Sequence, residues 1–194
     1  NFMLSGHASF PLCITWALKE VIAMYYPPRK LAAAAVCAIL AGCVLHFLYA
    51  WIPNAFTALF SPICESLWEH GKLIFWPYLL AALWLNRGRP SGIRPWMLVL
   101  LGMITAMLAL GVLFHILLQV NILWVDLLLY GALMALGFWL PTRFSGPFPA
   151  PLWLLPGAAA AVLGILFGLF TLWPPQHILF SDLSALQTWY QIPC

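Results

Sequence analysis

Histidines and carboxylic acids are the residues of this sequence that could do chemistry, and several of them fall within or beside long apolar segments. They are His46, Glu65, Glu69, His70, His115, Asp126, His177 and Asp182. Imidazole and carboxylate groups together can hold Zn²⁺ or another divalent metal ion. They can also carry protons as general acids and bases. Ionisable side chains are costly within apolar segments that enter a membrane, so their presence predicts a functional site.

The residue types suggest three roles. The candidate catalytic residues are Glu65, Glu69 and His70, the candidate metal ligands are His46, His115 and Glu69, and the candidate ligand-binding residues are Asp126, His177 and Asp182. The metal would be a divalent ion such as Zn²⁺. The sequence has no HExxH motif and no two histidines four residues apart. Acid–base catalysis without a metal and plain ligand binding therefore stay open as alternatives.

The acids of residues 61–72 are expected to begin a helix. Ser61 is the predicted N-cap, because serine caps helices and a proline follows it. At 100° per residue, Glu65, Glu69 and Lys72 would then share one stripe of that helix. In the functional interpretation, a carboxylate of the stripe faces the histidines of other helices. In the structural interpretation, the acids stabilise the helix N-terminus and Lys72 neutralises one of them.

Two other parts of the candidate site also have structural alternatives. Asp126 could simply cap or anchor the helix that it begins. The segment with His177 and Asp182 follows two prolines, which make a rigid extended exit from the preceding helix. This segment could fold back over a cavity or run free.

The composition decides which class of protein must position these side chains. Of the 194 residues, 64% are hydrophobic and 7% are charged, whereas soluble domains carry about 25% charged residues. A soluble domain of this size could not bury so much apolar surface. The formal net charge of +3 is too small for a nucleic-acid binder. The sequence therefore predicts an all-α integral membrane helical bundle whose main partner is the lipid bilayer.

Apolar runs of the length that crosses a bilayer predict five transmembrane helices. They cover residues 31–51, 65–85, 96–119, 123–140 and 152–173. Residues 10–26 are expected to form an interfacial helix or a sixth span, because Lys19 and Glu20 interrupt their apolar character. The chain then divides into an N-terminal helix (1–30), the bundle (31–173) and an extracytoplasmic tail (174–194).

The basic residues predict the orientation of this bundle in the cell membrane. All six basic residues near the spans fall on one side of the five-span arrangement, and they are Arg29, Lys30, Arg87, Arg89, Arg94 and Arg143. The positive-inside rule makes that side cytoplasmic. Most of the histidines and acids then gather at the extracytoplasmic side.

Small residues and cysteines give two further expectations. A stripe with Gly157, Gly164 and Gly168 predicts close helix contact, either within the bundle or in a homo-oligomer or larger membrane complex. The five cysteines show no CxxC spacing, and we interpret them as small buried hydrophobic residues. Cys43 could alternatively be a lipidated cysteine.

The motif residues resemble a known family. The sequence Ser61-Pro62-Ile63-Cys64-Glu65-Ser66-Leu67-Trp68-Glu69-His70-Gly71-Lys72 has the form SPxxESxWEHxK. With His46, His115 and Asp126, this segment resembles a family of small bacterial multi-pass membrane proteins of unknown function, over about residues 31 to 182. The resemblance implies membrane residence and brings no activity with it.

Three functions fit these observations. One is a membrane enzyme with an outward-facing metal-assisted or acid–base site that acts on a lipid-like substrate. Another is a non-catalytic subunit or binding module whose buried charges hold the bundle together. The third is a small proton- or ion-coupled transporter, which would need a polar path that the inner half of the spans, apart from Thr105, does not supply.

Overall fold

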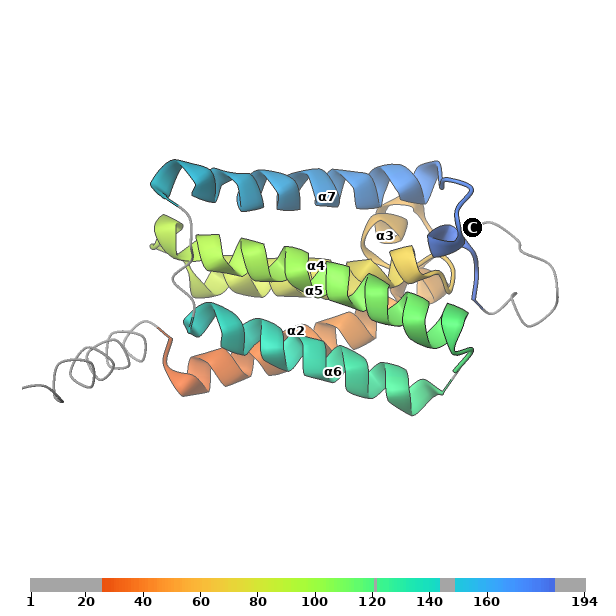
Figure 1. The fold of residues 1–194 in the computed structure, drawn as a ribbon, viewed down its shortest axis with the longest axis horizontal. Coiled ribbons are helices and arrows are strands. Elements are labelled where there is room, and N and C mark those ends of the chain that lie inside the picture. The colour runs from red at the N-terminus through yellow and green to blue at the C-terminus, as the bar shows by residue number, and fades with distance from the viewer. Residues whose placement is uncertain (1–25, 121, 144–148, 184–194) are drawn as a thin grey trace, which may run out of the picture.

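A computed structural model describes residues 26–120, 122–143 and 149–183 (Figure 1). The described chain is all-helical, which confirms the predicted class. Its α-helices are α2 (Pro28–Trp51), α3 (Ala55–Phe60), α4 (Leu67–Leu85), α5 (Ile93–Gly111), α6 (Leu123–Trp139) and α7 (Leu154–Leu172). The shorter elements are η1 (Pro90–Gly92), η2 (Val112–Leu117), η3 (Leu140–Thr142), η4 (Ala150–Trp153) and η5 (Ile178–Phe180). The helix predicted over residues 10–26 lies almost entirely outside the described residues.

The long helices form an up-and-down bundle in which α2, α5 and α7 run one way and α4 and α6 run back (Figure 1). Four helical segments are long and apolar enough to cross a membrane, and they cover Pro28–Trp51, Ile93–Leu117, Leu123–Thr142 and Pro151–Leu172. Each matches a predicted span to within a few residues. Large apolar side chains such as Leu40, Leu128 and Leu154 are exposed on the outside of the bundle, as a bilayer environment allows.

The remaining predicted span corresponds to α4, which lies inside the bundle and packs against α2, α5, α6 and α7. It is not one of the four strongly apolar segments, because it carries Glu69 and Lys72. Both of these side chains are buried. The bundle thus encloses the helix that has the charged residues.

The predicted beginning of this helix was wrong. Ser61 does not start α4 but ends the short helix α3, and its hydroxyl group donates to the Leu45 carbonyl of α2. The N-cap of α4 is Ser66, whose hydroxyl oxygen accepts from the Glu69 backbone N–H at 3.3 Å. Glu65 therefore lies in the turn before α4, so it does not share a helical stripe with Glu69.

One end of the bundle is tightly filled and carries the basic residues. Tyr78, Trp96 and Leu100 are fully buried there, and the Tyr78 hydroxyl group donates to the Gly137 carbonyl of α6 at 2.8 Å. The beginning of α2, the α4–α5 connection and the end of α6 with η3 all lie at this end (Figure 1). The six basic residues are therefore gathered at one end of the bundle, as the predicted five-span arrangement requires.

The glycine stripe of α7 mostly serves contact within the bundle. A Cβ atom at Gly164 would lie 3.1 Å from the Phe75 ring of α4, and one at Gly168 would lie 3.5 Å from Leu59 of α3. At Gly157, a Cβ atom would meet nothing within 4 Å. The first of the two interpretations of this stripe is confirmed at Gly164 and Gly168.

The interpretation of the cysteines as buried hydrophobic residues is wrong for the three that the structure describes. Cys37 and Cys43 are free thiols exposed on α2. They are exposed because α2 packs on the bundle through small residues such as Ala34, Ala38 and Gly42, which leaves its other faces outside. Cys64 is one half of a disulfide.

Candidate functional site

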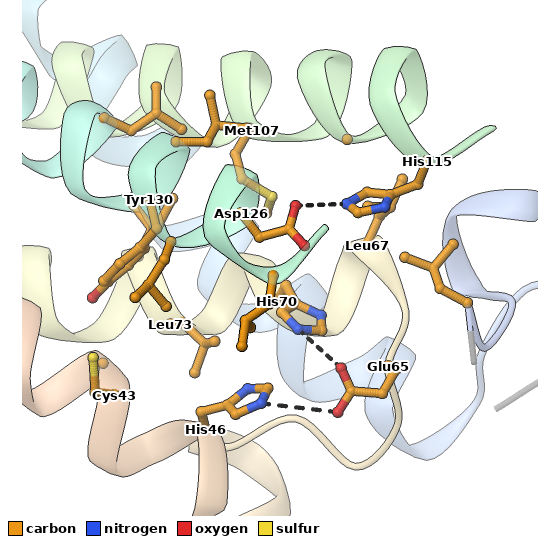
Figure 2. A pocket seen from close by; sticks show the side chains of 18 of the residues that line it. Cys43, His46, Glu65, Leu67, His70, Leu73, Met107, His115, Asp126 and Tyr130 are labelled. Carbon is orange, nitrogen blue, oxygen red and sulfur yellow. Dashed lines mark ion pairs between the residues drawn. The ribbon is translucent and has the colours of Figure 1, made fainter. Parts of the chain in front are cut away.

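The end of the bundle away from the basic residues contains a pocket of about 590 Å³, within the range of small-molecule sites. It lies between α2, α4, α5 with η2, and α6, and most of its lining is apolar. Five ionisable side chains also line it, namely His46, Glu65, His70, His115 and Asp126 (Figure 2). Five of the eight predicted site residues thus surround one pocket.

Glu65 is at the centre of a three-residue cluster. One carboxylate oxygen lies 3.2 Å from His70 Nε2 of α4, and the other lies 3.9 Å from His46 Nε2 of α2. The two imidazole rings have centroids 5.4 Å apart. One ligand atom from each of the three residues can be chosen such that all lie within 4.8 Å of one another. This is the only such group of three metal-ligating side chains in the described part of the chain.

Ser66 fixes the tautomer of His70. The Nδ1 atom of His70 lies 2.8 Å from the Ser66 carbonyl oxygen, and a carbonyl oxygen only accepts hydrogen bonds, so Nδ1 carries a hydrogen. The other nitrogen, Nε2, points at Glu65 (Figure 2). Metal-binding histidines typically donate their second ring N–H to a carbonyl or carboxylate in this way. His70 is therefore oriented as a metal ligand would be.

The environment of Glu65 stabilises its charged form. The hydrogen bond from His70 lowers the pKa of the Glu65 carboxyl group below its ordinary value. The side chain is about half exposed, so the pocket has access to the outside at this residue. Glu65 is thus a carboxylate, available as a metal ligand or a proton acceptor.

A second pair, His115 and Asp126, lies on the opposite side of the pocket. His115 Nε2 is 3.0 Å from an Asp126 carboxylate oxygen (Figure 2). His115 belongs to η2, a π-helical turn that continues α5, and such turns frequently occur at functional sites. Asp126 lies in the first turn of α6 and its carboxylate faces His115. The structure thus pairs Asp126 with a histidine of the neighbouring element η2, a contact that a simple helix cap would lack.

Glu69 is not among the residues that line the pocket. Its Oε2 atom lies 2.6 Å from Lys72 Nζ, and both side chains are almost completely buried. The carboxylate also accepts from the Ile63 backbone N–H at 3.0 Å and from the Thr171 hydroxyl group at 3.3 Å. The structural interpretation, in which Lys72 neutralises an acid, applies to this residue. We leave Glu69 out of the proposed metal site.

The described part of the tail folds back onto the bundle. The Leu183 backbone N–H donates to the Glu65 carbonyl at 3.0 Å, and Leu183 lines the pocket. Phe180 packs on Trp68 with ring centroids 5.2 Å apart. His177 is exposed and accepts from the Leu179 N–H, and neither His177 nor Asp182 lines the pocket. The described part of the tail therefore reaches the site through Leu183 and not through the predicted ligand-binding residues.

A model described as a family of unknown function matches residues 22–190. The chain belongs to DUF6512. The predicted resemblance to a family of unknown function is confirmed, and the DUF6512 match covers every residue that lines the pocket. No curated protein and no solved structure matches the chain.

Sequence reasoning missed how the site of this DUF6512 member is assembled. It paired His46 and His115 with one carboxylate, whereas the structure pairs them with two different ones. It also missed Ser66, which caps α4 and orients His70. A signal was present, because Ser66-Leu67-Trp68-Glu69 has the Ser-x-x-Glu spacing of a capping box. Reading it would have placed Glu65 before the helix.

Proposed function

We propose that this protein is an integral membrane enzyme that holds a Zn²⁺-like divalent ion at His46, Glu65 and His70. It uses the ion to hydrolyse a bond of a lipid-like substrate in the adjoining pocket. The observation that carries the proposal is the contact between His70 and Glu65. Because Nδ1 of His70 carries a hydrogen, the Nε2 atom of a neutral ring and the Glu65 carboxylate oxygen 3.2 Å away are both acceptors, and a cation must lie between them. That cation is either a proton or a metal ion.

Three features favour a metal ion over a proton. The ligands come from three segments, α2, the turn before α4 and α4 itself. Ligand atoms about 2.0–2.2 Å from a shared ion lie within roughly 4 Å of one another. The three ligand atoms here lie within 4.8 Å of one another, so a short inward movement of the side chains would bring them around an ion. The Ser66 carbonyl holds the outer nitrogen of His70 in the manner of a second coordination shell. Three protein ligands leave a fourth position for water, as in catalytic zinc sites.

The residues on the other side of the pocket suit proton transfer. A divalent ion held by His46, Glu65 and His70 would supply a water nucleophile, with its pKa lowered to about 7, for an acyl or phosphoryl centre. His115, oriented by the Asp126 carboxylate at 3.0 Å, would take the proton of that water. It would then return the proton to the oxygen of the departing group. In this proposal, one wall of the pocket binds the metal ion, and the His115–Asp126 pair on the facing wall transfers the proton.

We further propose that α4 is a fifth membrane-spanning helix and that the basic end of the bundle is cytoplasmic. The charges of α4 support this placement because Lys72 and Glu69 neutralise each other inside the bundle. The disulfide of Cys64, in the turn beside the pocket, supports an extracytoplasmic site, because disulfides persist in oxidising compartments. The six basic residues at the opposite end agree with the positive-inside rule.

The filled half of the bundle favours an enzyme over a transporter. Tyr78, Trp96 and Leu100 are completely buried between the pocket and the basic end. A transported ion would have to displace this packing on every cycle. The pocket therefore has the form of a site that opens on one side.

The metal content of the purified protein tests the proposal. The full chain is purified in detergent without chelators, saturated with Zn²⁺, freed of excess ion and measured by inductively coupled plasma mass spectrometry. We expect about one zinc ion per chain. His70→Ala and Glu65→Gln should lower zinc affinity at least about tenfold.

The exposed His177 offers a matched control, because it is a histidine outside the pocket. His177→Ala should bind zinc like the unchanged protein. Equal zinc binding by the His70→Ala and Glu65→Gln variants would overturn the metal site. A wild-type chain that holds no zinc would leave the proton, and hence acid–base chemistry, between Glu65 and His70.

A further inference from the structure

We infer that the pocket receives the acyl chain of a bilayer lipid, which enters sideways between α2 and α6 and not from the aqueous end. This inference rests on the membrane location in the proposed function and specifies the substrate of that site. The bond to be cleaved would then lie beside His46, Glu65 and His70, and the chain would occupy the apolar part of the pocket.

The exposure of the lining residues locates the opening. Cys43 and Phe47 of α2 and Leu123 and Leu127 of α6 all line the pocket. Yet all four are exposed on the outside of the bundle, Phe47 and Leu127 by 50% and Leu123 by 70%. Residues that face both a pocket and the outer surface form the rim of an opening. This rim is apolar and belongs to two segments long and apolar enough to cross a membrane.

The opening between α2 and α6 ends near the middle of both helices, where they contact each other. The Tyr130 hydroxyl group of α6 donates to the Ile39 carbonyl of α2 at 3.3 Å, and Tyr130 packs against Gly42, where a Cβ atom would collide with its hydroxyl group. From this crossing, α2 and α6 separate towards the end that holds the site (Figure 1). The opening therefore faces one half of the membrane, on the side of the polar cluster.

The polarity of the residues that line the inner wall of the pocket indicates which kind of molecule can bind there. Leu73 and Ile74 of α4 and Leu133 of α6 line it and are at most 9% exposed. The imidazoles and carboxylates lie instead on two facing walls at one end of the pocket, while Cys43 and Tyr130 lie at the other end (Figure 2). A molecule that matches this lining is polar at one end and an aliphatic chain at the other. Because the rim opens onto the apolar outer surface, a membrane lipid reaches the pocket without crossing water.

Photo-crosslinking with a lipid tests the route. The full chain is reconstituted into phosphatidylethanolamine and phosphatidylglycerol vesicles with a trace of phosphatidylcholine that carries a diazirine in its acyl chain. After illumination, the adducts are mapped by mass spectrometry. We expect adducts at Leu73, Ile74 or Leu133, because these buried side chains contact a lipid only inside the pocket.

Two pairs of variants ask whether the chain passes between α2 and α6. Cys43→Trp obstructs the rim, whereas Cys37→Trp adds the same bulk at another exposed cysteine of α2 that does not line the pocket. Leu127→Trp and Leu128→Trp form the corresponding pair on α6, since only Leu127 lines the pocket. We expect the first member of each pair to reduce the internal adducts about tenfold or more. The second member should leave them unchanged.

The outcomes separate this inference from the metal site, because zinc content is measured on the same samples. Internal adducts that fall only in the rim variants support the sideways route, whether or not zinc is bound. Adducts confined to outward-facing side chains overturn it, as do internal adducts that the rim variants leave unchanged. If zinc is absent while the adducts behave as expected, the metal site fails and the lipid route stands.

Discussion

Lys72 illustrates at the residue scale how a charge can be built into the interior of this bundle. Its ammonium group is fully buried and donates to the Glu69 carboxylate and to the Ala58 carbonyl at 2.8 Å. Glu69 in turn accepts from the Ile63 backbone. The pair therefore ties α4 to the segment that delivers Glu65 to the pocket, so we regard it as support for the site and not as part of its chemistry.

Removing one member of this pair should be costly. Lys72→Met leaves the Glu69 carboxylate buried without its counter-charge, and breaking such pairs costs about 3–5 kcal/mol. We expect a large fall in the thermal unfolding midpoint, measured by the fluorescence of the detergent-solubilised protein. The double variant Glu69→Gln/Lys72→Met removes both charges and keeps an acceptor for Ile63, so it should recover more than half of the loss. Equal losses in both proteins would contradict the pairing argument.

The residue types of the site were predictable, but their pairing was not. His46, His70 and Glu65 stand out because ionisable side chains are rare in this sequence. Which carboxylate meets which histidine depends on how α2, α4, α5 and α6 are rotated against one another. The π-helical turn adds a further rotation before His115, and an ideal helical repeat of 3.6 residues does not predict it.

At the scale of elements, the packing of α4 against its neighbours depends on glycine. A Cβ atom at Gly71 would lie 2.7 Å from the ring of Phe167, and Phe167 is completely buried, so it has no room to move. The glycine therefore allows α7 to lie close to the first turns of α4, where Glu69 accepts from Thr171. Apolar runs predicted the four strongly apolar segments to within a few residues, whereas this close approach depends on the shape of both helices.

Two alanine substitutions should separate close packing from helix propensity. Gly71→Ala should destabilise the protein by about 1–3 kcal/mol, since the added methyl group overfills a packed interface. Gly157→Ala adds the same methyl group to open space in α7 and should be neutral or stabilise by up to about 1 kcal/mol. Thermal unfolding of the two variants measures both effects. A stable Gly71→Ala protein would show that α4 and α7 are not closely packed.

For the molecule as a whole, polarity is distributed between two ends. One end carries the basic residues beside the fully buried Tyr78, Trp96 and Leu100, and the other carries the pocket, its imidazoles and its carboxylates. The uneven distribution was predictable from sequence, because helices of nearly constant length bring alternate connections to the same end. The pocket itself was not, because its existence depends on how far α2 and α6 separate.

Labelling of single introduced cysteines tests the proposed orientation. Ala55 is exposed at the end with the pocket, and Ser91 is exposed at the basic end. In a background with Cys37 and Cys43 replaced by alanine, which still holds Cys13, Cys64 and Cys194 and is labelled separately as the blank, a membrane-impermeant maleimide added to intact cells should label Ala55→Cys above that blank. It should label Ser91→Cys only after the membrane is permeabilised. The reverse pattern would place the pocket in the cytoplasm.

X-ray absorption at the zinc edge, on the purified full chain loaded with one equivalent of Zn²⁺, tests the central claim most directly. The proposed site predicts two imidazole nitrogens at about 2.0–2.1 Å and oxygen ligands at about 2.0–2.2 Å. His70→Ala should remove one of the two imidazole contributions. A shell of sulfur at about 2.3 Å, or a spectrum that His70→Ala leaves unchanged, would contradict a metal ion held by His46, Glu65 and His70.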